Sequence, residues 1–175
     1  PLAGLRPDLP TFRVPDATLY GRPDVGALLL GGWEPAARSC DPRAYVLSAE
    51  PPAIEPDWPV LANFAEEMAP LYPPVANAGI RHVFRGWPTF TPDGRFIVGE
   101  SRRVPGFIMA AGCNAHGVSG SAGIGRHVVE ALLEPKPSTY VRSLSPDRFT
   151  ESSWNWDEAR RRAQAIYETY YHIGH

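Results

Sequence analysis

The chain has 175 residues, enough for one ordinary domain with a hydrophobic core, and its 43% hydrophobic content excludes a disordered protein. A formal net charge of −2 provides no overall attraction to nucleic acid or to anionic lipid, so neither partner is expected. Twenty prolines and sixteen glycines indicate many turns but follow no repeat period, which excludes collagen-like and solenoid folds.

The first predicted elements are three short strands. Residues 12–14 and 17–20 flank a Pro-Asp turn, and the compact apolar segment Ala27–Glu34 is typical of a buried strand. Its Gly31-Gly32 pair indicates either a bulge or a close approach of neighbouring atoms to the backbone. Arg38–Pro56 is rich in proline and is predicted to be irregular.

A helix and a strand meander are predicted next. Asp57 is expected to cap a helix that Pro70 ends, because apolar residues recur between them at helical spacing: Leu61, Phe64, Ala65 and Met68. The turn Thr91–Gly94 joins two predicted strands, since its proline presets φ and its glycine accepts a positive φ. The expected three strands of this meander are Arg81–Phe90, Arg95–Glu100 and Phe107–Ala111.

Two helices are predicted in the remainder of the chain. The first follows a glycine-rich turn and carries an apolar stripe of Ile124, Val128 and Leu132 before Pro135 stops it. The second is predicted over Asp157–Tyr171, with Asn155 and Glu158 spaced as a capping box. Its run of three arginines, residues 160–162, is interpreted as a solvated face.

The turn of residues 113–119 is a candidate site. A helix N-terminus presents N–H groups without intrahelical partners and a positive dipole end, so it can stabilise an anionic atom; a purely structural connection is the alternative. Gly120–Gly125 reads G-x-x-G-x-G, which is not the dinucleotide fingerprint, and Ser119 does not stand in a G-x-S-x-G elbow. The histidines show no metal-ligand spacing, so no metal is predicted.

Other features leave alternatives open. Tyr20 and Arg22 can share one strand face and hold a carboxylate, or they can be ordinary surface residues. Cys40 and Cys113 form no CxxC pair and are interpreted as reduced thiols, with a disulfide as the alternative. No apolar run reaches the length of a membrane span. The first ten residues have neither an initiating Met nor a signal-peptide pattern, so the chain is expected to begin inside a longer protein.

Three segments, taken in order, resemble one protein family: Leu19–Pro35, Arg85–Glu100 and Phe107–Pro137. They are similar to the FAD-dependent amine oxidoreductases of the D-amino-acid oxidase and glycine oxidase superfamily, above all to dimethylglycine and sarcosine dehydrogenases. The resemblance implies an α+β fold, with the antiparallel sheet of a substrate-binding domain and a strand–turn–helix that completes an FAD-binding domain. It covers most of the chain.

The resemblance also implies a division of the chain. Residues 1–90 would be part of the substrate domain, 91–140 the strand–turn–helix segment of the FAD-binding domain, and 141–175 a C-terminal extension leading to an absent downstream domain. The N-terminal dinucleotide motif of the family is missing here, so binding of FAD needs the missing N-terminal part and the fragment alone should be inactive. Tetrahydrofolate is an expected second cofactor, in the absent downstream domain.

Particular residues take their expected roles from this resemblance. The turn is assigned to the isoalloxazine ring, where its helix start would stabilise negative charge, and the implied cofactor contacts are Gly112, Asn114, Ala115, His116, Gly117 and Val118. Tyr20 matches a tyrosine that faces the substrate and is the candidate catalytic residue. Arg22 and Glu34 align with the dehydrogenases' pattern and are candidate substrate contacts.

The implied reaction is hydride transfer to the flavin from the carbon beside the nitrogen of an N-methylated amino acid. Gly86 stands where sarcosine oxidases carry a flavin-linking cysteine, and Ser119 where they carry a lysine that promotes reaction with oxygen. Both departures favour a protein electron acceptor over oxygen. The expected location is the bacterial cytoplasm or, in a eukaryote, the mitochondrial matrix. The alternatives are a non-catalytic regulatory protein of the same fold, like the pyruvate dehydrogenase phosphatase regulatory subunit, and an unrelated small α+β binding domain.

Overall fold

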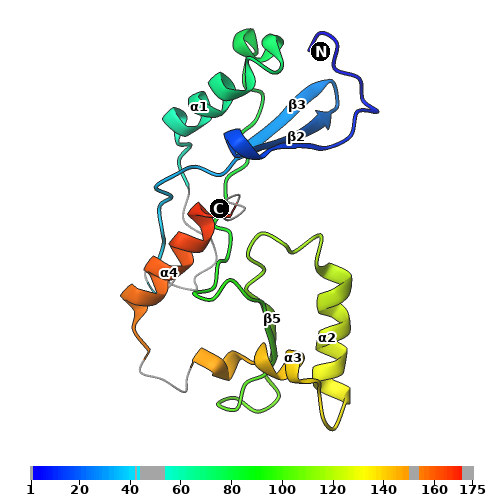
Figure 1. The fold of residues 1–175 in the computed structure, drawn as a ribbon, viewed down its shortest axis with the longest axis vertical. Helices are drawn as coiled ribbons and strands as arrows, with labels where there is room; N and C mark the ends of the chain where they lie inside the picture. The colour runs from blue at the N-terminus through cyan, green and yellow to red at the C-terminus, as the bar shows by residue number, and fades with distance from the viewer. Residues whose placement is uncertain (1, 42, 44–53, 150–153, 171–175) are drawn as a thin grey trace. The chain divides into compact units, whose positions relative to one another are not determined.

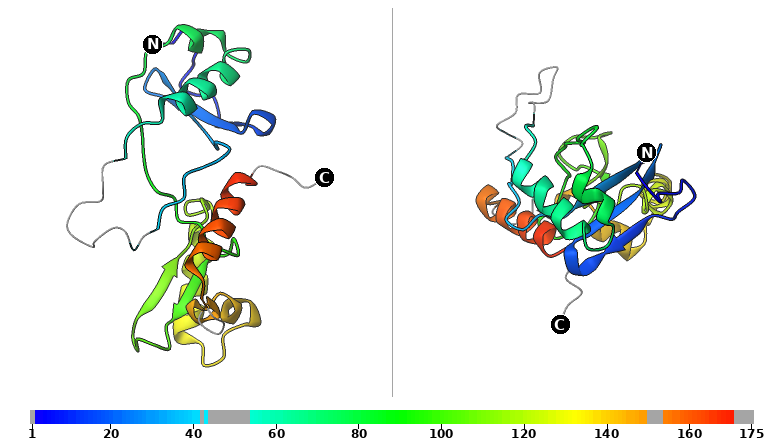
Figure 2. Two further views of the ribbon diagram at one scale, coloured as in Figure 1. Left: turned by 90° about the vertical axis from the view of Figure 1, so that its left-hand side faces the viewer. Right: turned by 90° about the horizontal axis from the view of Figure 1, so that it is seen from above.

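The computed structural model describes residues 2–41, 43, 54–149 and 154–170 (Figure 1). The chain divides into two compact units, which Figure 2 shows from two further directions. Unit 1 comprises Pro1–Ala37, Arg43–Gly86 and Glu168–His175, and unit 2 comprises Arg38–Pro42 and Trp87–Tyr167. The observed elements are α-helices and small antiparallel sheets, so the predicted α+β class is confirmed at this level.

Unit 1 is built on a three-stranded antiparallel sheet in the order β1-β2-β3. The strands are β1 (Phe12–Val14), β2 (Leu19–Asp24) and β3 (Ala27–Gly32). Val25 and Gly26 join β2 to β3 with φ of 47° and 76°, the pair of positive angles that a two-residue hairpin turn of type I′ requires. β2 therefore extends beyond the predicted 17–20 segment, and β3 ends before Glu34.

Helix α1 (Trp58–Met68) packs on one face of this sheet. The side chain of Asp57 accepts a hydrogen bond from the backbone N–H of Val60 at 3.4 Å, so the predicted cap is confirmed. Phe64 and Met68 project from the same side of α1 and form the core of the unit with Leu19, whose side chain is 0% exposed. A Cβ at Gly32 would lie 2.6 Å from the Phe64 ring, which shows a close approach at this glycine.

Unit 2 contains the β-hairpin of β4 (Ile97–Glu100) and β5 (Ile108–Ala111). Helix α2 (Ser121–Leu133) packs against β4, and its predicted end before Pro135 is confirmed. The short helix α3 (Thr139–Ser143) also contacts β4, and the N–H of Val98 donates to the carbonyl of Leu144 at 2.9 Å. Val98 and Leu144 are each 1% exposed and form the core of this unit.

The remaining elements are short helical segments and one longer helix. The 3-10 turns are η1 (Pro15–Ala17), η3 (Pro73–Asn77) and η4 (Pro146–Phe149). Helix α4 (Trp156–Glu168) begins as predicted, with the N–H of Glu158 donating to Asn155 Oδ1 at 3.0 Å. It ends three residues before the predicted end, Tyr171, which lies outside the described residues.

The predicted strand Arg81–Phe90 is wrong, and with it the three-stranded meander. The described backbone from Gly79 to Thr91 has no strand, and the sheet in the described part of unit 2 contains β4 and β5 alone. Phe84 is 76% exposed, so the apolar residues of this segment do not alternate into a core. Period-2 alternation forms a strand only when a neighbouring edge completes the hydrogen-bond ladder, and the described residues provide no such edge here.

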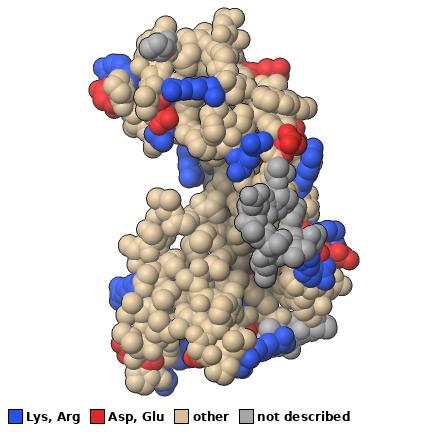
Figure 3. Space-filling view, turned by 180° about the vertical axis from the view of Figure 1, so that it is seen from behind, with Lys and Arg blue, Asp and Glu red and all other residues tan. Residues whose placement is uncertain are grey.

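The described surface agrees with the small net charge. On the face in Figure 3, basic and acidic side chains are interspersed and do not gather into one basic patch. No helix in the described ranges is both long and apolar enough to span a membrane. Cys40 and Cys113 are both free thiols.

Candidate functional site

The turn between β5 and α2, residues 112–118, has a backbone that few sequences can adopt. Gly112, Asn114 and Ala115 have φ of 64°, 45° and 60°, all in the left-handed region. A Cβ at Gly112 would lie 2.5 Å from Thr91 Cγ2 and 3.2 Å from Ile97 Cγ1. Glycine at position 112 is therefore required both by the backbone conformation and by the space around it.

Asn114 fastens this turn to the segment before β4. The residue is 3% exposed, and its Oδ1 accepts a hydrogen bond from the Thr91 backbone N–H at 2.9 Å. Its Nδ2 donates to the carbonyl of Gly112, and its backbone N–H donates to the carbonyl of Thr89 at 3.0 Å. The polar groups of the Asn114 side chain are thus used within the protein, where they hold the turn in shape.

The residues that follow are on the surface. Ala115, His116, Gly117 and Val118 are all exposed, Val118 by 92%. The N–H of Gly120 donates to the carbonyl of His116 at 2.8 Å, which makes 116–120 a single helical turn ahead of α2. Within the part of the chain that the structure describes, the N–H groups of Gly117, Val118 and Ser119 have no hydrogen-bond acceptor. These N–H groups can therefore be offered to a ligand.

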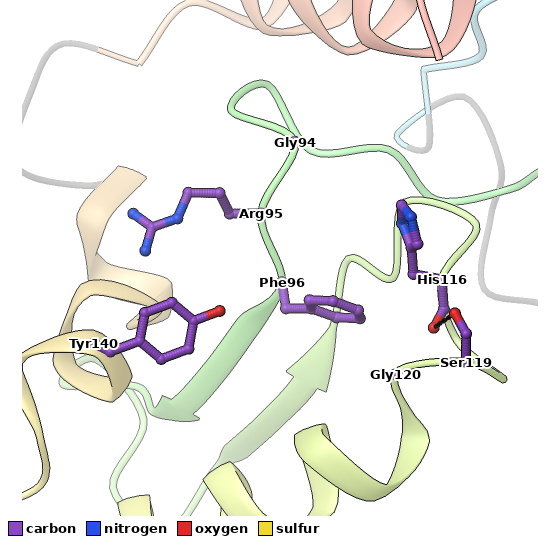
Figure 4. Close-up of a pocket in the computed structure, with 7 residues that line it drawn as sticks. All are labelled: Gly94, Arg95, Phe96, His116, Ser119, Gly120 and Tyr140. Atoms are coloured by element: carbon purple, nitrogen blue, oxygen red, sulfur yellow. Dashed lines mark hydrogen bonds between the residues drawn. The ribbon is translucent and has the colours of Figure 1, made fainter. Parts of the chain in front are cut away.

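A cleft of about 360 Å³ lies beside the turn. Figure 4 shows the Phe96 ring between the side chains of Tyr140 and His116. The guanidinium of Arg95 lies 6.0 Å from the Tyr140 ring centre, and its Nη2 donates to Ser143 Oγ at 2.6 Å. The full lining is Gly94, Arg95, Phe96, His116, Ser119, Gly120 and Tyr140. Because it includes an arginine and no carboxylate, the cleft suits a neutral or anionic ligand.

Asp93 is the acidic residue nearest in sequence to this cleft, and its charge is matched by Arg148. Partial burial alone raises the pKa of Asp93, but hydrogen bonds from Arg148 and the Arg95 backbone, with the charge of Arg148, outweigh it. The pKa of Asp93 is therefore below its ordinary value of 3.8, and the carboxylate is ionised at neutral pH.

The lowered pKa gives a pH dependence with a defined sign. A depressed pKa stabilises the folded protein above the ordinary value of 3.8, and this contribution is lost as the pH falls through the lower folded-state pKa. We expect Asp93→Asn to destabilise the protein at pH 7 and to have a smaller effect at pH 3, below the ordinary pKa of 3.8. Urea unfolding at both values checks this, with Asp8→Asn in the exposed Arg6–Asp8 pair as the control. An equal effect of Asp93→Asn at both pH values would contradict it.

The other sequence-predicted residues belong to unit 1, whereas the turn belongs to unit 2. Tyr20 and Arg22 both lie on the exposed face of β2, opposite the face that packs on α1. Arg22 forms an ion pair with Asp24 at 2.9 Å, and the ring of Tyr20 lies over Gly31 on the paired strand. Glu34 follows the end of β3 and is half-buried.

Sequence reasoning missed the residues that support the turn. It identified Thr91–Gly94 only as a connection between strands, whereas Thr91 and Asp93 belong to the network that fixes residue 114. Thr91 is buried, but a threonine does not mark a core position in a hydrophobic pattern. Arg148 lies 55 residues from its ion-pair partner Asp93, so no local pattern links these two residues. No group of three or more potential metal ligands occurs in the described ranges.

Comparison with known proteins places the chain in a family. The model of the FAD dependent oxidoreductase family, DAO, matches residues 1–131, so the chain belongs to this family of flavoproteins. The resemblance recognised in the sequence is thereby confirmed. No solved structure matches the chain.

Three curated relatives of the chain differ from one another in function. The chain is 29% identical over 91% of its length to 4-methylaminobutanoate oxidase (formaldehyde-forming) of Paenarthrobacter nicotinovorans, covering 19% of that protein. It is 27% identical to the mitochondrial sarcosine dehydrogenase of Mus musculus and 29% identical to the mitochondrial pyruvate dehydrogenase phosphatase regulatory subunit of the same species. These two matches each cover 83% of the chain and 16% of the relative. The chain spans less than a fifth of the length of the relatives that it matches.

Proposed function

We propose that the chain is the C-terminal part of the oxidoreductase region of an FAD-dependent amine dehydrogenase. Its substrate would be a secondary or tertiary amine of the N-methylated amino acid class, such as sarcosine or dimethylglycine. The observation that carries this proposal is the fixed turn at residues 112–118, with N–H groups that have no acceptor among the described residues, in a member of a flavin-dependent family.

The residues of the turn fit a flavin. The N–H groups of Gly117 and Val118 and the adjoining start of α2 provide partial positive charge, and the cleft beside them contains no carboxylate to oppose an anionic edge. FAD, when bound, supplies the hydride acceptor for oxidation of the amine. The turn's own contribution is to hold donors where negative charge develops.

The division of labour in the chain follows from the same proposal. Residues 1–90 contribute to the substrate domain, residues 91–140 complete the FAD-binding domain, and residues 141–175 lead to a downstream domain. Such a downstream domain would bind tetrahydrofolate. The protein would act in the bacterial cytoplasm or, in a eukaryote, in the mitochondrial matrix.

Tyr20 and Arg22 are the proposed contacts to the substrate, with Glu34 as a further candidate. Their spacing on β2 places a phenol and a guanidinium on one face of the sheet, which is a suitable pair for a carboxylate. Gly31 opposite Tyr20 leaves room for its ring to lie across the strands, since a Cβ there would be 2.7 Å from the phenol oxygen.

We expect Tyr20→Phe to lower kcat/KM for an amine that carries a carboxylate by about tenfold, because it removes one hydrogen bond to a charged group. An otherwise similar amine without the carboxylate should lose less than half of its kcat/KM. Steady-state kinetics of the full-length enzyme with both amines checks this. The control is Tyr72→Phe, since the hydroxyl of Tyr72 donates to the Ala3 carbonyl and its ring packs on the Leu19 side of the sheet, opposite the face of Tyr20. Equal losses for the two amines would remove Tyr20 from the carboxylate site.

The electron acceptor is proposed to be another protein. Ser119 lies at the cleft, so no lysine ammonium is present at this point of the turn to promote reaction with oxygen. A dye acceptor should therefore reoxidise the reduced enzyme faster than air does.

Anaerobic bleaching of the flavin tests the proposed function itself. The full-length protein should show a flavin absorption spectrum that bleaches on addition of sarcosine, dimethylglycine or a related N-methylated amine. Absence of bleaching with a panel of such amines would contradict the proposal. It would support the second candidate, a non-catalytic regulatory protein, which is favoured by the match to the phosphatase regulatory subunit and by the lack of an acid–base pair among the residues lining the cleft.

A further inference from the structure

We propose that Arg148 is a positioning residue for the turn at 112–118 and acts on it through Asp93, Thr91 and Asn114. The inference rests on the proposed function, in which that turn faces the flavin. It assigns a role in the reaction to η4, a segment that lies outside the family match.

The first step is the ion pair between Arg148 and Asp93. Nε of Arg148 donates to Asp93 Oδ2 at 2.8 Å, and Nη2 donates to Asp93 Oδ1 at 3.2 Å, which is the bidentate geometry of a strong pair. The remaining N–H groups donate to backbone carbonyls: Nη1 to Leu144 at 2.7 Å and Ser145 at 3.1 Å, and Nη2 to Arg95 at 3.1 Å. Every donor of the guanidinium is thus used, which fixes the orientation of Asp93.

The second step links Asp93 to Thr91. The Thr91 hydroxyl lies 3.1 Å from Asp93 Oδ1 and 2.9 Å from the carbonyl of Arg95. The backbone N–H of Arg95 donates to the same Oδ1 at 3.2 Å, so the Asp93 carboxylate links the residues on the two sides of the turn. Thr91 is 3% exposed and is held in place by these hydrogen bonds together with its packing.

The third step links Thr91 to the flavin-facing turn. Its N–H donates to Asn114 Oδ1 at 2.9 Å, and its hydroxyl lies 3.3 Å from the same oxygen. Thr91 Cγ2 also limits the space beside Gly112. A shift of Thr91 would therefore move Gly112 and Asn114, two of the three residues of the turn with positive φ.

The proposed effect is on where the N–H groups of residues 117–119 point, and so on how well they stabilise charge as the amine is oxidised. Small displacements of such donors reduce the rate of the chemical step more than they reduce substrate binding. Arg148 itself contacts backbone and Asp93, so removing it leaves the donors present but held less firmly.

The test uses the full-length protein with Arg148→Gln, and Asp93→Asn as a second variant that preserves side-chain shape. The matched control is Arg161→Gln, which removes an exposed ion pair of unit 2 between Arg161 and Glu158. Both test variants should reduce the rate of flavin reduction by about tenfold or more in rapid mixing, with less than a twofold change in the Kd of the amine. Arg148→Lys keeps the positive charge but lacks the two parallel N–H donors of the guanidinium. It should therefore retain part of the flavin-reduction rate that Arg148→Gln loses.

Amide hydrogen exchange provides a readout that does not need turnover. In both test variants the exchange of the Asn114 amide, which donates to Thr89, should be accelerated about tenfold more than that of the Ser101 amide, which donates to Phe107 in the β4–β5 hairpin. Unchanged Asn114 exchange would overturn the proposal, and so would equal acceleration at Ser101, since that indicates loss of stability alone. Faster Asn114 exchange in a protein without amine-dependent bleaching would support the positioning role and refute the proposed function.

Discussion

Gly112→Ala is expected to destabilise unit 2 by roughly 2–4 kcal/mol and to reduce flavin binding by the full-length protein more than any other substitution in the turn. Two independent costs add at this position. An L-residue with a side chain is strained at φ of 64°, and its Cβ would lie 2.5 Å from the Thr91 methyl group. Because Thr91 is buried and hydrogen-bonded, it cannot move aside without releasing Asn114.

The matched control for this prediction is Gly123→Ala. Gly123 lies inside α2, and an added Cβ there meets no atom within 4 Å. Alanine in a helix interior should raise stability by roughly 0.5–1 kcal/mol relative to glycine. Gly123→Ala should therefore raise, or leave unchanged, both the free energy of unfolding and the ratio of bound flavin to protein. Gly112→Ala should lower both quantities. A Gly112→Ala protein with normal stability and flavin content would refute the assignment of the turn.

Leu144→Ala is expected to destabilise unit 2 by roughly 3 kcal/mol. The side chain is 1% exposed where α3 meets β4, so its truncation removes packing and leaves a cavity that the surrounding backbone cannot close. Its carbonyl accepts hydrogen bonds from the Val98 backbone and from Arg148, and the substitution leaves both possible. The loss is therefore attributable to the core and not to the network.

Leu133→Ala is the control for the core prediction, because it makes the same change on a side chain that is 74% exposed at the end of α2. We expect it to change stability by less than about 0.5 kcal/mol. The free energy of unfolding of unit 2, measured in urea, distinguishes the two variants. Equal effects would mean that Leu133 is covered in the full-length protein or that Leu144 is not a core residue.

The sequence predicted those elements whose determinants are local. Asp57 and Pro70 delimit α1 because a cap and a helix breaker act within a turn or two, and Pro135 similarly follows the end of α2. The glycine-rich turn after β5 was predicted, but not the positive φ of Asn114 and Ala115, which are not glycines. Its assignment to a flavin came from ordered resemblance, since a strand, a turn and a helix have the same local pattern in many unrelated proteins.

Other features depend on partners distant in the sequence. The segment before Thr91 alternates like a strand, but a strand exists only where another edge pairs with it. Asn114 was predicted as a cofactor contact and stays a prediction; its side chain also supports the turn from within, through Thr91, which is 23 residues away. The ion pair of Arg148 and Asp93 likewise has no local signal in the sequence. An arginine in a short helical segment is common, and nothing near it in the sequence indicates a partner.

The turn with positive φ at Gly112, Asn114 and Ala115 has a consequence for how a ligand would bind. Its conformation is held by contacts formed entirely within unit 2, from Thr89 to Arg148. The loop is thus preorganised, and the entropy of ordering it is lost during folding and not on association. An apoprotein with this loop already in shape would bind its cofactor in a single fast phase, with no slow rearrangement to follow.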